Sequence, residues 1–107
     1  MAEKALQVNF KYNVPIEPLM EGTVKSADEI ASKPGLRWKI WVYNDETKEA
    51  GGLYLFEDDA SADAYTEWVM DALESNPAAS DITVKKFDIN EDATAITRGP
   101  VAERVST

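Results

Sequence analysis

The block from Pro34 to Glu57 constrains the fold of this chain more than any other part of the sequence. Two runs rich in aromatic and β-branched residues flank the polar segment Asp45–Lys48. Such side chains suit a pleated strand and polar residues suit the turn between strands, so the block predicts a β-hairpin. Two of the three tryptophans of the chain lie in its first strand, next to Arg37 and Lys39.

The predicted elements around the hairpin follow from apolar spacing: alternation in strands and a three- to four-residue period in helices. In chain order they are a strand (5–12), a helix (16–31), the two hairpin strands, a helix after Asp58 and Asp59, a strand (81–89) and a short helical turn (91–98). Asn13 is able to cap the first helix, and Asp58 with Asp59 the second. The order β-α-β-β-α-β predicts an α+β, ferredoxin-like fold with a four-stranded antiparallel sheet.

Composition excludes several classes of function. At 107 residues we expect a single domain, 1–107, with a core over about 5–97 and a tail over 98–107. The net charge of −9 disfavours binding to nucleic acid or to an anionic membrane surface. The chain has no cysteine and no histidine, which removes thiolate chemistry and the commonest metal ligand and base. We therefore expect no metal site and no bound cofactor.

The predicted location is the cytoplasm. No segment of the chain is as long and apolar as a membrane-spanning helix. The first residues carry an early acid and lack the continuous apolar core of a signal peptide.

Both faces of the predicted hairpin carry large apolar side chains. Simple alternation places Leu36, Trp38, Ile40 and Val42 on one face, and Trp41 and Tyr43 on the other. Helices can cover only one face of the sheet, and an exposed apolar face promotes association. We therefore expect a homodimer in which a second copy covers the open face.

Several segments resemble the YdhR-like monooxygenase family over roughly residues 5 to 97. The more specific ones are Pro34–Trp41 (PGLRWKIW) and Glu49–Phe56 (EAGGLYLF), supported by Leu6–Asn13, Ser61–Tyr65 and Lys86–Glu91. The resemblance implies a dimeric α+β barrel, in which two ferredoxin-like sheets pack face to face and each subunit holds a ligand cavity. The wider superfamily includes cofactor-independent quinol oxygenases and haem-degrading enzymes. This chain departs from the haem-degrading branch because it has no histidine to ligate iron.

An oxygenase without a cofactor needs a dry slot for a flat substrate and donors that stabilise an oxyanion. The candidate catalytic residues are Trp41, Arg37 and Asn9, and the candidate substrate-binding residues are Trp38, Lys39, Gly52, Tyr54 and Phe56. With a turn at Asp45–Lys48, Arg37 falls opposite Phe56, Lys39 opposite Tyr54, and Trp41 opposite Gly52. Glycine in a strand leaves room for a flat ligand to lie against it.

Each candidate also has a purely structural interpretation. Trp38 suits core or dimer packing, and Arg37 with Lys39 suits an edge strand protected by charge. Gly51 with Gly52 suits a β-bulge, and Asn9 suits a solvated or interfacial amide. A one-residue error in the turn would move every candidate of the strand to the other face.

Three functions remain open at this level. The first is a monooxygenase that oxidises a small aromatic, phenol- or quinol-like compound with O₂ and without a cofactor. The second is a dimer that binds a small hydrophobic ligand without converting it. The third is an isomerase or lyase that uses Tyr54 or a buried carboxylate, although Glu49 more simply suits a surface acid beside the turn. The family resemblance favours the first.

Overall fold

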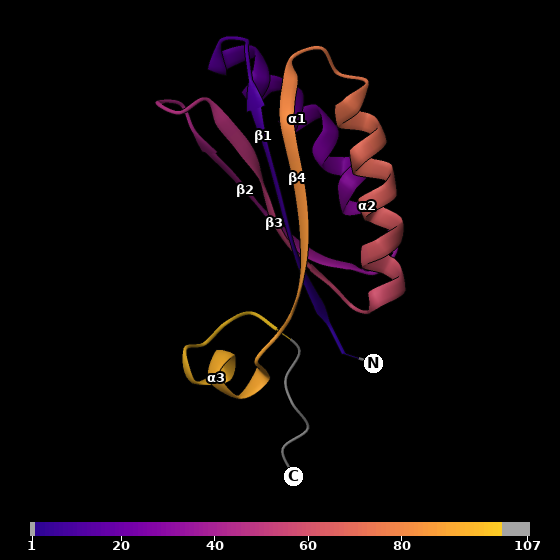
Figure 1. Ribbon diagram of the computed structural model, residues 1–107. Coiled ribbons are helices and arrows are strands. Elements are labelled where there is room, and N and C mark those ends of the chain that lie inside the picture. The colour runs from indigo at the N-terminus through magenta and orange to yellow at the C-terminus, as the bar shows by residue number, and fades with distance from the viewer. Residues whose placement is uncertain (1, 102–107) are drawn as a thin grey trace.

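The computed structural model describes residues 2–101 and confirms the predicted order of elements (Figure 1). The elements are β1 (Lys4–Tyr12), α1 (Ile16–Ala31), β2 (Leu36–Asn44), β3 (Glu49–Phe56), α2 (Asp59–Glu74), β4 (Ala79–Asp88) and α3 (Glu91–Ile96). The four strands pair antiparallel in the order β2-β3-β1-β4. The last strand starts earlier and the last helix ends earlier than predicted, and most of the predicted tail lies outside the described residues.

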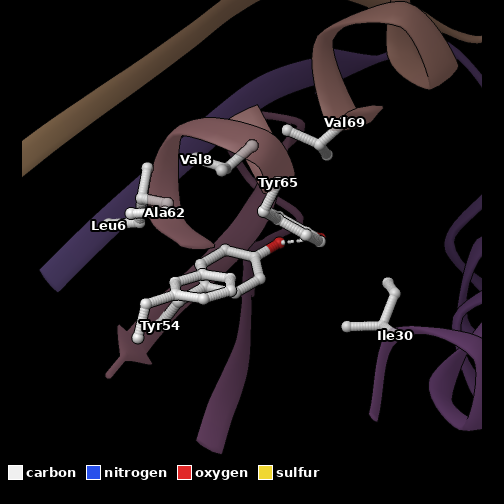
Figure 2. Packing of buried hydrophobic residues seen from close by; sticks show 8 residues of the cluster. Leu6, Val8, Ile30, Tyr54, Ala62, Tyr65 and Val69 are labelled. Atoms are coloured by element: carbon white, nitrogen blue, oxygen red, sulfur yellow. Dashed lines mark hydrogen bonds between the residues drawn. The ribbon is translucent and has the colours of Figure 1, made fainter. Parts of the chain in front are cut away.

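Both long helices lie on the same face of the sheet, while α3 lies beyond the end of β4 and away from them (Figure 1). The buried layer between sheet and helices takes residues from β1, β3, α1 and α2. Its members are Leu6, Val8, Ile30, Tyr54, Phe56, Ala62, Tyr65 and Val69 (Figure 2). Burial of one large apolar side chain contributes about 1.5–3 kcal/mol, so this layer holds the helices on the sheet. Within residues 2–101, no helix is long and apolar enough to cross a membrane.

The two long helices begin differently. The Asp58 side chain accepts a hydrogen bond from the Ser61 backbone N–H at 2.8 Å, which confirms the predicted cap of α2. The predicted cap of α1 is wrong: Pro15 occupies the cap position without a side-chain hydrogen bond. The Asn13 amide instead donates to the Pro77 carbonyl at 3.3 Å, because the chain before α1 passes close to the chain before β4.

The hairpin turn falls at Asp45–Lys48, as predicted. The Asn44 side-chain oxygen accepts from the backbone N–H groups of Glu46 and Thr47, at 3.0 and 3.3 Å. Lys48 closes the turn in the left-handed region, with φ of 59°. This turn aligns Asn44 with Glu49 and thereby sets the register of β2 on β3.

Gly51 and Gly52 lie in continuous register with both neighbouring strands, so the alternative of a β-bulge at these glycines is wrong. Gly51 is required by close packing. A Cβ atom at this position would lie 1.8 Å from the backbone carbonyl oxygen of Val8. The glycine therefore permits β1 and β3 to pair at the centre of the sheet.

Candidate functional site

A one-residue bulge in β2 puts Leu36 on the same face of the strand as Lys39 and Trp41. Leu36 pairs with Phe56 and Trp38 pairs with Leu55, so Arg37 is the extra residue between them. The prediction that Arg37 lies opposite Phe56 is therefore wrong. Beyond the bulge, the predicted pairs are confirmed: Lys39 lies opposite Tyr54, and Trp41 opposite Gly52.

A cavity of about 560 Å³ lies between the helix-facing side of β1, β2 and β3 and the two long helices. Its walls are mostly apolar and aromatic. They include Val8, Phe10, Lys39, Trp41, Tyr43 and Tyr54 from the sheet, Leu19, Met20 and Ile30 from α1, and Tyr65, Trp68, Val69 and Leu73 from α2. A cavity of this size and lining, with few polar groups, is typical of a site for a small organic molecule.

The Lys39 amine is the charged group of this cavity. Its Nζ atom lies 3.3 Å from the centroid of the Trp41 ring and 4.7 Å from that of the Tyr54 ring. Within residues 2–101, no carboxylate lies within ion-pair distance of it. Burial without a counter-charge lowers the pKa of Lys39 to about 7. Near neutral pH the amine is therefore divided between its neutral and its protonated form.

Gly52 makes room for this lysine. A Cβ atom at Gly52 would lie 2.5 Å from Cε of Lys39 and 3.0 Å from the Tyr54 ring. The predicted gap above the glycine is thus filled by the Lys39 side chain and is not open to a ligand. The glycine lets the lysine lie flat along the sheet, with its amine beside the two rings.

Two tyrosines, Tyr54 and Tyr65, supply hydroxyl groups to the wall of the cavity. The hydroxyls of Tyr54 and Tyr65 are hydrogen-bonded at 2.9 Å, and their rings lie 4.9 Å apart (Figure 2). Burial raises the pKa of Tyr65 to about 12 and raises the pKa of Tyr54 as well, so both are protonated at neutral pH. Their mutual bond uses only one of the two hydroxyl protons, which leaves the other for a ligand.

Tyr65 is not among the residues that the sequence predicted for the site. The available signal was the residue type, because a buried tyrosine hydroxyl usually has a hydrogen-bond partner. The partner itself lies on another element and could not be identified from helical spacing.

The structure places Arg37 and Asn9 away from the cavity. At the bulge, Arg37 forms ion pairs with Glu3 at 3.4 Å and with Glu57 at 3.9 Å. On the open face of the sheet, the Asn9 amide donates to Glu49 at 3.1 Å. Hydrogen bonds from Thr47 and Asn9 hold the pKa of Glu49 below its usual range, which leaves this acid ionised.

Trp38 and Phe56 also lie outside the cavity. Trp38 pairs with Leu55 and faces the open side of the sheet, where its indole N–H donates to the Pro100 carbonyl at 2.6 Å. Phe56 is fully buried in the core, with its ring 5.2 Å from that of Tyr65. Of the predicted site residues, the structure therefore gathers Lys39, Trp41 and Tyr54 at the cavity.

Comparison with known proteins places the chain in a family. Residues 5–100 match the family model described as "Putative mono-oxygenase ydhR". The chain belongs to this family. A search of curated proteins finds no match.

Solved structures similar to this ydhR-family protein share its fold. One is a dimeric ferredoxin-like protein from an uncultured marine organism, with a TM-score of 0.60 and 18% identity over 84% of this chain and 97% of that chain. Another is the heme-degrader MhuD from Mycobacterium tuberculosis, solved with two hemes in its active site. Its TM-score is 0.60, with 15% identity over 80% of this chain and 95% of that chain. Identities this low show the fold alone.

The lowered pKa of Lys39 predicts a pH-dependent effect of Lys39→Met on stability. Between about pH 7 and about pH 10.4 the unfolded chain binds the extra proton, so the contribution of Lys39 to stability rises with pH across this window. Below about pH 7, the folded protein holds a buried ammonium group, which lowers its stability. We expect the Tm of Lys39→Met minus that of the wild type to be largest near pH 6 and to shrink by about pH 9. A difference that is constant with pH, measured by calorimetry, would contradict the burial of this charge.

Proposed function

We propose that this ydhR-family protein is a cofactor-independent monooxygenase that oxidises a small phenol or quinol with O₂ in the cavity between sheet and helices. The observation that carries the proposal is the Lys39 amine, held 3.3 Å from the centroid of the Trp41 ring inside an apolar cavity. It combines a base and a cation with a surface for a flat ring. The family description supports the reaction class.

Lys39 would ionise the substrate. With a pKa of about 7, a large part of the amine is neutral at physiological pH and accepts the phenol proton at Nζ. The resulting ammonium then pairs with the phenolate, which restores a counter-charge that the cavity otherwise lacks. In a medium of low dielectric constant this pair is much stronger than in water, so substrate binding favours the ionised state.

The phenolate is electron-rich enough to reduce O₂, so the substrate supplies the electrons. For a phenol oxidised to a para-quinone, a ring C–H bond is broken and a C=O bond forms. One oxygen atom enters the product and the other leaves as water. Tyr54 and Tyr65 would donate the spare hydroxyl proton to the oxygen anion that develops in the cavity, and Trp41 would stack on the substrate ring.

Heme degradation, described for MhuD, receives less support in this chain. The sequence contains no histidine and no cysteine, which are two of the usual protein ligands of heme iron.

We also propose that the open face of the sheet forms a homodimer. The marine ferredoxin-like protein, which is described as dimeric, supports this proposal. The exposed apolar side chains of this face include Ile40, Leu53 and Phe87. They are contributed by β2, β3 and β4 and lie opposite the cavity. A second copy would cover them without blocking the ligand site.

Oxygen uptake by the chelator-treated protein tests the proposed reaction. With 1-naphthol, substituted hydroquinones and small phenols as substrates, we expect uptake above the autoxidation rate. Lys39→Met should reduce kcat/KM about 100-fold or more, because it removes the base and the cation. Tyr54→Phe should reduce it less, since the Tyr65 hydroxyl remains.

Lys33→Met is the matched control, because Lys33 also lies over a tryptophan ring, 3.8 Å from the centroid of Trp68. This variant should keep wild-type uptake. Uptake that is equal in the wild type and Lys39→Met would contradict the mechanism. Absence of uptake with every substrate, together with quenching of Trp41 fluorescence by the same compounds, would favour the alternative of a ligand-binding dimer.

Sedimentation velocity tests the proposed dimer. The wild type should sediment at twice the chain mass, and Ile40→Glu or Leu53→Lys should shift it to the monomer by burying a charge in the interface. Val24→Glu is the control, because Val24 is 75% exposed on the outer side of the molecule, on α1. A wild-type protein that remains monomeric at high concentration would rule out the dimer.

A further inference from the structure

We propose that Lys39 is also a covalent site: its amine condenses with a small aromatic aldehyde held in the cavity, forming an imine and releasing water. This activity needs no oxygen and goes beyond the proposed oxygenation. Imine formation and the proposed oxygenation share the cavity and Lys39, but each is measured by a different experiment.

The position of the Lys39 amine carries this inference. Nζ lies beside the Trp41 and Tyr54 rings, in a cavity that is large enough for an aromatic guest. Cε lies over Gly52, in space that a side chain at this position would occupy. A lysine that is desolvated in an apolar pocket keeps a reactive neutral amine and is a typical imine-forming residue.

Three of the other lysines are paired with carboxylates. Lys86 donates to Asp59 at 2.5 Å and to Asp63 at 2.8 Å, and these bonds raise its pKa to about 12. Lys4 is paired with Asp88, and Lys48 with Asp45 at 3.3 Å. A carboxylate partner favours the protonated amine, which is not a nucleophile, so an aldehyde should react at Lys39 before it reacts at these three lysines.

The surroundings of Lys39 also favour the product. A protonated imine is a cation at the position of the ammonium, so it keeps the attraction to the face of the Trp41 ring. The aldehyde ring, conjugated with the imine, would extend into the apolar part of the cavity. These contacts stabilise the imine relative to the free aldehyde in water.

The condensation is balanced in atoms and electrons. Nζ attacks the carbonyl carbon and forms an N–C bond, which gives a carbinolamine. The C–O bond then breaks, and the oxygen leaves as water with the two hydrogens of the amine. The Tyr54–Tyr65 hydroxyl pair can donate a proton to the departing oxygen, and Lys39 needs no oxidant or reductant in this step.

Reductive trapping tests the inference. The protein is incubated near neutral pH with 4-hydroxybenzaldehyde and cyanoborohydride, which reduces an imine to a stable amine. We expect one adduct per chain, located on Lys39 by peptide mapping. It should form about tenfold faster than adducts on other lysines, because the neutral amine is far more populated at the lower pKa.

Two variants and one control complete the experiment. Lys39→Met and Lys39→Arg should both lose the fast adduct. The arginine variant keeps a cation beside Trp41, so loss of labelling in a folded Lys39→Arg protein cannot come from loss of charge. Lys33→Met should be labelled like the wild type. Labelling spread evenly over the lysines and the N-terminal amine, or a fast adduct that persists in both Lys39 variants, would overturn the inference.

The outcome is separable from that of the oxygen-uptake experiment. Trapping at Lys39 in a protein that consumes no oxygen would support the covalent site and contradict the oxygenase. Oxygen uptake without a fast adduct at Lys39 would support the oxygenase and contradict the covalent site.

Discussion

The register of β2 on β3, which the turn at Asp45–Lys48 sets and the bulge at Arg37 interrupts, is the constraint on which the proposed site depends. Side chains alternate along a strand, so one extra residue moves all that follow to the other face. Because Arg37 takes up this residue, Leu36 packs in the core while Lys39 and Trp41 also face the helices. Trp38 and Ile40 are directed to the open face. The turn thus places the amine in the cavity, and the bulge adds Leu36 to the same face.

The electrostatics of the cavity follow from this placement. An ammonium group taken out of water without a carboxylate is costly, and the faces of the Trp41 and Tyr54 rings offset part of this cost. The cost lowers the pKa of Lys39 to about 7. Such a lysine can accept a proton from an acidic substrate, hold the resulting anion, or attack a carbonyl carbon. These properties have one physical origin, which is burial of a single amine among aromatic rings.

Much of the fold could be predicted from the sequence, because periodicity, the cap at Asp58 and the turn at Asp45–Lys48 are local signals. The turn also predicted the pairing of Lys39 with Tyr54. The bulge at Arg37 leaves no local signature, so the prediction placed Arg37 at the site and Leu36 on the wrong face. The Tyr54–Tyr65 hydrogen bond joins two elements through the core, and it depends on helix packing that the sequence does not encode locally.

A direct measurement of the Lys39 pKa tests the central claim. In protein labelled with ¹³C at lysine Cε, an NMR pH titration should show one resonance with a midpoint near pH 7, absent from Lys39→Met. Addition of 1-naphthol should raise this midpoint, because a bound phenolate stabilises the ammonium. If every lysine titrates near its ordinary value of about 10.4, the amine is not buried as described and the proposed site is wrong.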